Sequence, residues 1–319
     1  MADDPSISDV PPHALDAWRD ARVAAGTRTR VQAVRVRLQD AAGLVTAEPV
    51  WATRSSPPFD AAGMDGIAVC AASAAGASET APVLLEPNAF DVVDTGDPMP
   101  EGRDAVVMRE HVRYVGQAAE LRAAARPGQH VREAGEDIGA AELLLPEGHR
   151  LRAVDLAAAA AAGATQLLVR RAPVVAVLPA RDEMRHPPAP CRDLEASVLM
   201  LAGQAREAGC DARCLPTEPG DQAGLANAVI AAAASCDLLI VVTRSVGGDD
   251  PIAKTLAQLG NLAWTGGVGR PGHQVLLGVV GSTPVLATPG DPAAAALMFD
   301  LLAVSLLAEL QGVPPGSGS

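Results

Sequence analysis

The stretch Asp-Leu-Leu-Ile-Val-Val, residues 237–242, decides the fold class of this chain. A short, continuous apolar run next to polar residues predicts a strand that is buried on both faces, as in a parallel sheet. Two similar runs lie on either side of it in the sequence, at 174–178 and 284–287. The carboxyl-terminal half of the chain is therefore predicted to form a sheet around these three strands.

Helical patterns alternate with these strands along the chain. Helices are predicted over residues 194–208, 221–234, 251–259 and 291–310, and further strands over 211–215 and 274–280. Such an alternation indicates a mostly parallel, doubly wound α/β domain, here over residues 173–311. The remaining stretch, 312–319, is rich in proline, glycine and serine and is expected to be a disordered tail.

Residues 53–131 show a different pattern, because proline, glycine and aspartate break their apolar runs into short pieces. The runs lie at 66–70, 83–85, 105–108 and 112–115. This pattern is typical of a small β-rich domain. The flanking stretches, 1–52 and 132–172, have helical patterns, which lie at 14–25, 30–46 and 154–163. We therefore expect a split, elongated helical domain into which the β-rich domain is inserted.

Composition excludes several classes of protein. The net charge of −13 argues against general nucleic-acid binding, which needs a basic face. No apolar run reaches the roughly 18 residues that span a membrane, and the start Met-Ala-Asp-Asp has no signal-peptide pattern. The five cysteines include no CxxC pair, so neither a disulfide framework nor a zinc ribbon is indicated. We expect a cytoplasmic protein with reduced thiols.

Three loops follow predicted strands: residues 179–183, 243–250 and 288–292. In an open α/β sheet, ligands bind in the crevice at the carboxyl ends of the strands. Each loop leads towards a helix, whose free N–H groups favour phosphate-like anions. Glycines permit close backbone approach, and basic side chains could bind phosphate. These candidates are Gly247, Gly248, Gly290, Arg181, Arg244 and Lys254, which is the chain's single lysine.

Acidic residues in the same loops are candidate ligands for Mg²⁺, which prefers oxygen atoms and often bridges to phosphates. They are Glu183, Asp249, Asp250 and Asp291. The alternative is structural, because glycine and aspartate also form turns and helix caps. Three such loops on one edge of the sheet favour the binding site.

Three sequence blocks in the first 170 residues carry a family pattern. Residues 57–69, PPFDAAGMDGIAV, resemble PPFDNSAMDGYAV, and residues 95–108, TGDPMPEGRDAVVM, resemble TGAPVPEGADAVVM. Residues 135–138 form the block GEDI, followed by Leu151 and Gly163. The chain thereby resembles the MoeA and gephyrin E-domain family of molybdopterin molybdenumtransferases, and the match continues more weakly to residue 311.

The resemblance implies a fold and an activity. It implies that the α/β domain is MogA-like and binds molybdopterin or its adenylylated form. It also implies a homodimer that uses Mg²⁺, inserts molybdate into the dithiolene of the pterin and releases AMP. The order of domains in the family agrees with the order that the sequence pattern predicts.

The resemblance and the three loops together give the candidate site residues. Asp65, Thr95, Asp137, Glu183 and Asp237 match positions that the family uses around its cleft, and the first four are the candidate catalytic residues. Glu183 and Asp250 are the candidate magnesium ligands. The cofactor-binding candidates are Arg181, Asp237, Thr243, Arg244, Ser245, Gly247, Gly248, Asp250, Lys254, Arg270, Pro289, Gly290, Asp291 and Pro292.

Several stretches depart from the family pattern. The SGGVSVG loop reads TRSVGG at 243–248, STGDEL reads PARDEM at 179–184, and KPGKP reads RPGHQ at 270–274. A serine of the family is replaced by Ala294, and the sequence ends at residue 319, where the family continues into a β-barrel domain. These changes remove N–H groups, a lysine and a hydroxyl that would bind anions. Molybdate is therefore expected to bind weakly.

Three interpretations remain. The first is a molybdenum insertase with a reduced site, which the retained Asp65, Thr95, Asp137 and Glu183 favour. The second is a non-catalytic chaperone or scaffold that holds molybdopterin or the finished cofactor for a molybdoenzyme, which the altered loops favour. The third is a structural dimerisation partner. The expected partners are a pterin phosphate or nucleotide, a second copy of the chain, and a molybdoenzyme or another cofactor-biosynthesis protein, with neither nucleic acid nor membrane.

Overall fold

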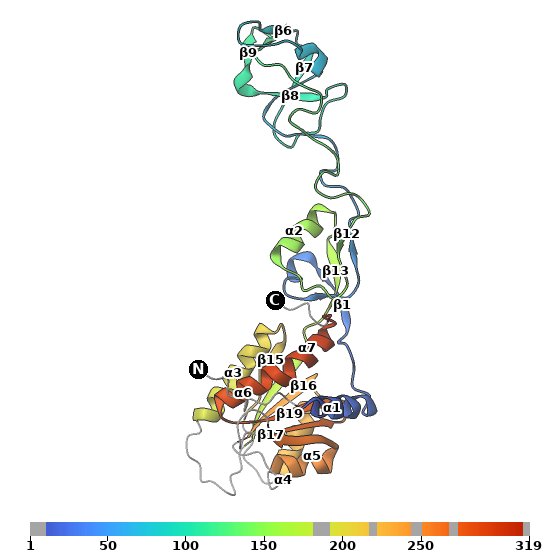
Figure 1. Ribbon diagram of the computed structural model, residues 1–319, viewed down its shortest axis with the longest axis vertical. Coiled ribbons are helices and arrows are strands. Elements are labelled where there is room, and N and C mark those ends of the chain that lie inside the picture. Colours follow the sequence, from blue (N-terminus) through green and yellow to red (C-terminus); the bar gives the residue numbers. More distant parts are fainter. Residues whose placement is uncertain (1–10, 181–191, 217–221, 244–250, 268–273, 315–319) are drawn as a thin grey trace, which may run out of the picture.

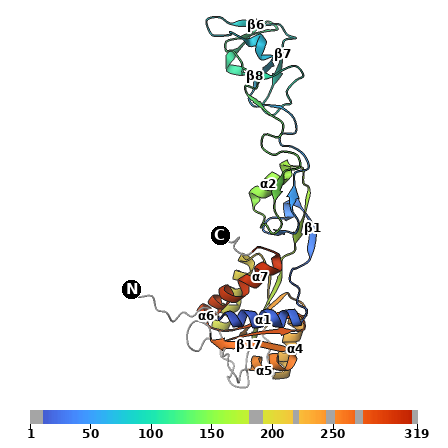
Figure 2. The same ribbon diagram turned by 45° about the vertical axis from the view of Figure 1, so that its right-hand side comes forward.

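The protein is a long molecule of three parts in a row (Figures 1 and 2). This computed structural model describes residues 11–180, 192–216, 222–243, 251–267 and 274–314. An α/β domain lies at one end and a β-rich module at the other, with a smaller domain between them (Figure 1). The chain passes through the middle domain twice, before and after the module, so the expected insertion of a β-rich domain into a split domain is confirmed.

The α/β domain is built on a six-stranded sheet. Its strands are β14 (Val174–Ala180), β15 (Asp211–Cys214), β16 (Leu238–Thr243), β17 (Asn261–Gly267), β18 (Gln274–Val280) and β19 (Thr283–Pro289). The order is β15-β14-β16-β19-β18-β17, and the first four are parallel neighbours. Strands β18 and β17 join antiparallel. The predicted mostly parallel sheet is confirmed, whereas β17, which ends in two glycines, was not predicted.

Helices cover both faces of this sheet. They are α1 (Pro12–Ala24), α3 (Arg192–Glu207), α4 (Gln222–Ala233), α5 (Pro251–Leu259), α6 (Pro292–Met298) and α7 (Val304–Gln311). Strand β16 shows why two layers are needed. Leu238, Ile240 and Val242 pack in a core with α1, α3, α6 and α7, while Leu239 and Val241 pack in a second core with α4 and α5. The doubly wound architecture is therefore confirmed.

Helix α1 belongs to the core of the α/β domain. Trp18 is buried there, and its indole Nε1 donates to the carbonyl of Gly278 in β18 at 2.9 Å. Arg22 on the same helix donates to Glu309 of α7 at 3.1 Å. The sequence pattern assigned this helix to the split domain, because neighbouring segments usually pack together. Its apolar face instead covers the sheet of the distant domain.

The middle domain is mostly strand. Strand β13 (Gln166–Arg170) lies between β1 (Ala33–Arg37) and β2 (Val45–Thr46), β3 (Val50–Trp51) pairs with β12 (Leu143–Leu145), and α2 (Ala153–Ala161) packs beside them. The helix predicted over residues 30–46 is wrong. The sequence there alternates, with Val34 and Val36 packed against the core and Arg35 and Arg37 exposed. An alternation of period two favours a strand over a helix.

The β-rich module contains three small sheets. Their orders are β7-β5-β8, β6-β10-β9 and β11-β4. The strand bounds are β4 Ala61–Ala62, β5 Gly66–Val69, β6 Val83–Leu85, β7 Phe90–Val93, β8 Ala105–Met108, β9 Val112–Val115, β10 Ala118–Leu121 and β11 Val131–Arg132. The four predicted apolar runs form β5, β6, β8 and β9. The main core of the module includes Ile67, Val69, Val107 and Leu121.

The last helical stretch, Pro292–Gln311, is one helix with a π-helical turn at Phe299–Ala303. By length and composition it is the one helix among the described residues that could cross a membrane. Half of the most apolar stretch of this helix is buried inside the protein, however. Met298, Leu302 and Leu306 pack in the core of the α/β domain. It therefore has the character of a core helix.

The amino end of α2 provides a stability test. The buried carboxylate of Asp155 accepts hydrogen bonds from the Arg152 N–H at 2.8 Å and from its guanidinium at 3.0 Å, and it contacts His149 Nε2 at 2.8 Å. The hydrogen bonds from Arg152 and His149 hold the pKa of Asp155 well below its usual range. We expect Asp155→Ala to lower the free energy of unfolding by about 1–2 kcal/mol at pH 7, the scale of a lost helix cap.

The pH dependence follows from the sign of this shift. The folded-state pKa lies below the unfolded value of about 3.9, so the stabilisation is present above that pH and is lost as the pH falls further. Urea unfolding at pH 7 and pH 3 should therefore show a larger difference between wild type and Asp155→Ala at pH 7. Asp155→Asn, which can still cap the helix, is the control for the charge. An equal difference at both pH values would contradict this account.

Candidate functional site

The carboxyl ends of three parallel strands lie side by side in the α/β domain. Ala180 of β14 pairs in register with Thr243 of β16, and Thr243 pairs with Pro289 of β19. The three loops that the sequence singled out all leave the sheet at these positions. The structure thus brings their starting points together on one edge, as the crevice hypothesis requires. We refer to this edge, from Ala180 through Thr243 to Pro289, as the carboxyl-edge crevice.

Close packing at this edge depends on Gly290. The carbonyl of Gly290 accepts a hydrogen bond from the hydroxyl of Ser197 on α3 at 2.8 Å. A Cβ atom at position 290 would lie 3.1 Å from Leu194 Cδ1 and 3.3 Å from the carbonyl oxygen of Thr243. A side chain there would require Leu194 and the carbonyl of Thr243 to shift by a few tenths of an ångström. The glycine keeps the loop after β19 close to the edge.

Two of the predicted binding residues in the loop after β19 have structural roles. The carboxylate of Asp291 caps α6 by accepting a hydrogen bond from the N–H of Ala294 at 2.9 Å. Pro292 occupies the first turn of α6, where the fixed φ of proline suits a helix start. Lys254 is exposed on α5, one turn after the loop that leaves β16. The structure thus brings five predicted residues together at the crevice: Thr243, Pro289, Gly290, Asp291 and Pro292. Lys254 lies on a helix that begins there.

The other predicted groups of this edge lie outside the described residues. They are Arg181, Glu183, Arg244, Ser245, Gly247, Gly248, Asp249, Asp250 and Arg270. Their proposed roles stay predictions.

Asp65 and Thr95 form a direct pair in the β-rich module. Asp65 Oδ1 accepts hydrogen bonds from the Thr95 hydroxyl at 2.7 Å and from the Thr95 N–H at 2.8 Å. The hydroxyl, the N–H and the nearby charge of Arg109 hold the pKa of Asp65 below its usual range. An exposed carboxylate of this kind is ionised at neutral pH, so it accepts hydrogen bonds or binds cations rather than donating a proton.

Asp137 lies in the connection between the module and the middle domain. Its carboxylate accepts a hydrogen bond from the guanidinium of Arg132, the last residue of β11. Its N–H donates to the carbonyl of Ser56 at 3.0 Å, so the incoming and outgoing chains are tied together there. Arg132 was not singled out from the sequence, because a surface arginine carries no signal of its partner.

The candidate residues therefore fall into two separate places within one chain. Asp65, Thr95 and Asp137 lie in or next to the module, and the carboxyl-edge crevice lies in the α/β domain. Figure 1 shows the middle domain between these two parts of the molecule. One copy of the chain does not bring them together.

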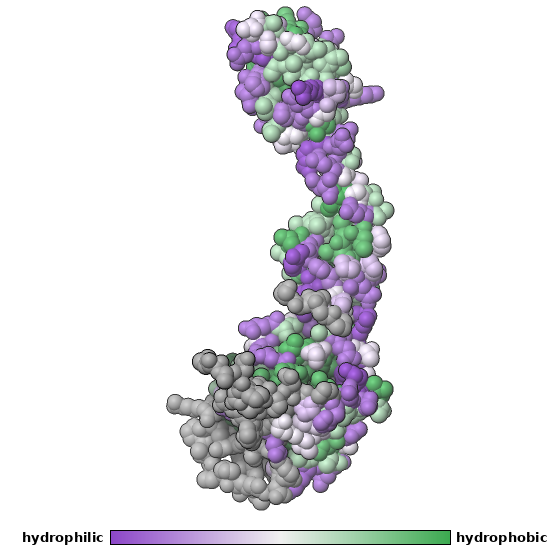
Figure 3. Space-filling model, in the orientation of Figure 1, coloured by the Kyte–Doolittle hydropathy of each residue, from purple (hydrophilic) through white to green (hydrophobic). Residues whose placement is uncertain are grey.

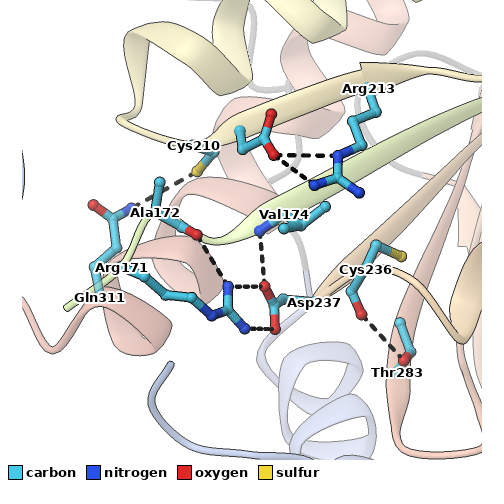
Figure 4. A network of polar contacts seen from close by, with 10 residues as sticks. Arg171, Ala172, Val174, Cys210, Arg213, Cys236, Asp237, Thr283 and Gln311 are labelled. Carbon is cyan, nitrogen blue, oxygen red and sulfur yellow. Dashed lines mark hydrogen bonds and ion pairs between the residues drawn. The ribbon is translucent and has the colours of Figure 1, made fainter. Parts of the chain in front are cut away.

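Asp237 lies at a third place. It precedes β16, at the amino edge of the sheet and thus opposite the carboxyl-edge crevice. Its carboxylate accepts two hydrogen bonds from Arg171, at 2.7 and 2.8 Å, and one from the N–H of Val174 at 2.7 Å (Figure 4). Burial opposes ionisation of Asp237, but these hydrogen bonds from Arg171 and Val174 hold its pKa below the usual range. The pair fixes the segment that enters the α/β domain.

Metal and thiol chemistry has little support among the described residues. No group of three His, Cys, Asp or Glu side chains there is placed to hold a metal ion. Burial raises the pKa values of Cys210 and Cys236 to about 12, so both thiols are protonated and unreactive at neutral pH. The four described cysteines, Cys70, Cys210, Cys214 and Cys236, form no disulfide, as expected for reduced thiols.

Comparison with known families covers most of the chain. Residues 14–163 match the MoeA N-terminal region (domain I and II), and residues 192–309 match a probable molybdopterin binding domain. The chain belongs to the MoeA family. Both matches agree with the order of the split domain, the inserted module and the α/β domain.

Individual MoeA-family relatives support the same assignment. A molybdopterin molybdenumtransferase 2 of Mycobacterium tuberculosis is 29% identical over 322 residues, covering 92% of this chain and 79% of that protein. A molybdopterin molybdenumtransferase of Haemophilus influenzae is 29% identical over 296 residues, covering 87% and 72%. Two crystal structures of a MoeA protein from Pyrococcus horikoshii match with TM-scores of 0.73 and 0.74, at 25% and 24% identity. They cover 96% and 97% of this chain, and 81% of each of those chains.

The Asp65–Thr95 pair of this MoeA-family chain gives a prediction. Thr95→Val removes the hydroxyl but keeps the N–H and the shape of the side chain. We expect the pKa of Asp65 to rise towards the ordinary value of about 3.9, because the largest cause of its depression is gone. Titration of the carboxyl carbon by NMR measures this shift. Thr95→Ser, which retains the hydroxyl, should behave like wild type, and an unchanged titration in Thr95→Val would contradict the assignment.

Proposed function

We propose that this protein binds molybdopterin, or its adenylylated form, at the carboxyl-edge crevice and acts in molybdenum insertion during cofactor biosynthesis, in the cytoplasm. The observation that carries the proposal is the alignment of Ala180, Thr243 and Pro289 at one edge of a parallel sheet. Helices α5 and α6 begin at or just after this edge, and α5 carries the exposed Lys254. A crevice of this kind suits a ligand that bears phosphate.

Asp65 and Thr95 would supply the second part of the site. The two hydrogen bonds from Thr95 keep Asp65 ionised and fix its orientation. An ionised carboxylate near neutral pH can orient polar groups of the pterin or bind a cation, but it is a poor general acid. We therefore assign Asp65 a role in substrate orientation and Thr95 the role of holding it.

Magnesium is expected from the family rather than from the geometry. Among the described residues, Asp291 uses its carboxylate as a helix cap, and no group of three possible ligands is found. These residues do not by themselves fit a Mg²⁺ ion. The two predicted ligands, Glu183 and Asp250, lie outside the described residues, so no step of the proposed chemistry is assigned to the metal.

The second candidate function is a non-catalytic chaperone or scaffold that holds molybdopterin or the finished cofactor. The specific observation in its favour is Ala294, a buried alanine in the first turn of α6, at the position where the family pattern has serine. The family's lysine pair is also replaced, by Arg270 and His273. The loss of two anion contacts at about 1.5–3 kcal/mol each would weaken molybdate binding by roughly two to four orders of magnitude.

Calorimetry with AMP and with molybdate tests the crevice. AMP should bind, and Lys254→Ala should weaken its binding about 10- to 100-fold, the effect of one charge-assisted contact. Arg35→Ala is the matched control, because Arg35 is exposed on β1, outside the α/β domain, and its loss changes the net charge equally. Free molybdate should bind weakly. AMP binding that is absent, or equal in wild type and Lys254→Ala, would refute the proposal.

A turnover measurement separates the two candidate functions. Molybdate-dependent release of AMP from adenylylated molybdopterin by the purified protein identifies an insertase. Binding of molybdopterin without any such release identifies the chaperone or scaffold.

We also propose that the protein works as a homodimer. Within one chain, the middle domain separates Asp65 and Thr95 from the carboxyl-edge crevice (Figure 1). A two-fold related copy could bring the module of one subunit to the α/β domain of the other, and the symmetry would form two such sites at once. Light scattering at micromolar concentration should give twice the mass of the chain, 32.4 kDa.

Mixing two variants that are defective in different parts of the proposed site tests whether the subunits share it. In Asp65→Asn the module is defective, and in Lys254→Ala the crevice is defective. After subunit exchange, half of the dimers are mixed and each has one intact shared site, so about a quarter of wild-type AMP release should return. A monomeric mass, or no recovery in a mixture with proven exchange, would exclude a shared site.

A further inference from the structure

A cavity of about 570 Å³ opens at the amino edge of the sheet, opposite the carboxyl-edge crevice. Several segments of the chain meet in its wall. The turn after α1 contributes Thr27 and Arg28, the segment that enters the α/β domain contributes Arg171, and the amino edge of the sheet contributes Asp237. The volume lies in the range of about 300–1,000 Å³ that is usual for small-molecule sites.

The charges in this wall favour an anion. Arg171 and Asp237 neutralise each other through their two hydrogen bonds (Figure 4). Arg28 is exposed, and its charge also acts on Asp237. Two guanidinium groups thus face one carboxylate, in a chain whose net charge is −13. A local excess of positive charge on an acidic protein has to be built by individual side chains, and here it comes from Arg28.

A hydroxyl in the same wall lacks a partner. Thr27 Oγ1 is buried without a hydrogen-bond partner among the described residues. A buried polar atom without a partner is unfavourable. Beside it, the wall is apolar at Ile230 and Val280. The wall therefore offers a charged and polar end next to an apolar surface.

The carboxyl end of α4 also faces the cavity, and its carbonyl groups would repel an anion. Thr283 Oγ1 donates a hydrogen bond to the carbonyl of Ala233 at 2.7 Å, and Ser235 Oγ donates to the carbonyl of Ala232 at 3.0 Å. Two of the terminal carbonyls are thereby satisfied within the protein. The repulsion that a bound anion would meet is reduced accordingly.

We propose that this cavity binds a small organic anion. Its carboxylate or phosphate group contacts Arg28, and its apolar body lies against Ile230 and Val280. The site is separate from the carboxyl-edge crevice and does not depend on the function proposed above.

Calorimetry with phenyl phosphate, which carries a phosphate group on an apolar ring, tests the proposal. Arg28→Ala should weaken binding at least about tenfold, the effect of a charge-assisted contact of about 1.5 kcal/mol or more. The matched control Arg35→Ala should bind like wild type. Loss of binding in Lys254→Ala with retention in Arg28→Ala would locate the ligand at the other edge and overturn the proposal. So would the absence of binding.

Further measurements test the apolar surface and the location of the site. Inorganic phosphate should bind more weakly than phenyl phosphate, and equal affinity would refute the apolar contact.

The location of the site is tested by a variant that fills the cavity. Ala234→Phe fills the cavity from an exposed position without changing the charge, and it should abolish binding while the protein keeps its melting temperature. Hydrogen exchange should slow at residues 171–174 and 280–283 when phenyl phosphate is added. Protection confined to residues 288–292 would contradict the site. AMP binding lost in Lys254→Ala but retained in Arg28→Ala would show that the two sites are independent.

Discussion

The burial of strand β16 on both of its faces is the constraint on which the rest of the α/β domain depends. All six residues from Leu238 to Thr243 are buried, and their side chains alternate between two cores. A charged or unpaired polar side chain in this stretch would be desolvated on either face, at a cost of several kcal/mol. The strand therefore needs a parallel neighbour on each side and a helical layer above and below. Once it is placed, the ends of β14 and β19 are fixed beside Thr243.

The junction between the domains is held by different forces. Arg150 of the middle domain donates to the carbonyl of Ala208 at 3.3 Å and to the side chain of Gln311 at 2.6 Å, both in the α/β domain. A Cβ atom at Gly148 would come within 2.6 Å of the carbonyl oxygen of Gly312, so a glycine is needed at this close approach. Together with the Arg171–Asp237 pair, these contacts are polar and local. Polar interfaces between domains generally permit more relative motion than apolar cores.

The local sequence pattern correctly predicted those elements in which the order of apolar and polar residues matches one regular pattern of burial. Strand β16 is apolar from Leu238 to Val242, and α5 was predicted with the bounds that it has in the structure. The stretch at residues 30–46 was misjudged, because its apolar residues fit a helical spacing over the whole length. The shorter alternation from Ala33 to Arg37 determines the structure instead, since β1 gains a complete ladder of hydrogen bonds with β13. Such a ladder depends on residues more than 100 positions away, which a local pattern does not contain.

The candidate site shows the same limit. The resemblance supplied Asp65 and Thr95 as separate residues, but their hydrogen bond requires the antiparallel pairing of β5 with β7, which places Gly66 opposite Val93. Asp237 is the opposite case. It stands before its strand in the sequence, so it had to lie at the amino edge, whereas the three loops follow their strands. This topological argument was available from the sequence and separates Asp237 from the carboxyl-edge crevice within one chain.

The elongated shape places a further condition on any site that combines the module with the α/β domain. The incoming and outgoing chains are hydrogen-bonded along the way, through Ser56 with Ile138 and through Trp51 with Leu143. The module therefore cannot fold back onto the α/β domain without breaking these pairs and exposing their polar groups. The less costly way to join the two parts is a second copy arranged in the opposite direction. In a two-fold arrangement every contact is made twice, so a moderate interface on each subunit is sufficient to hold both shared sites.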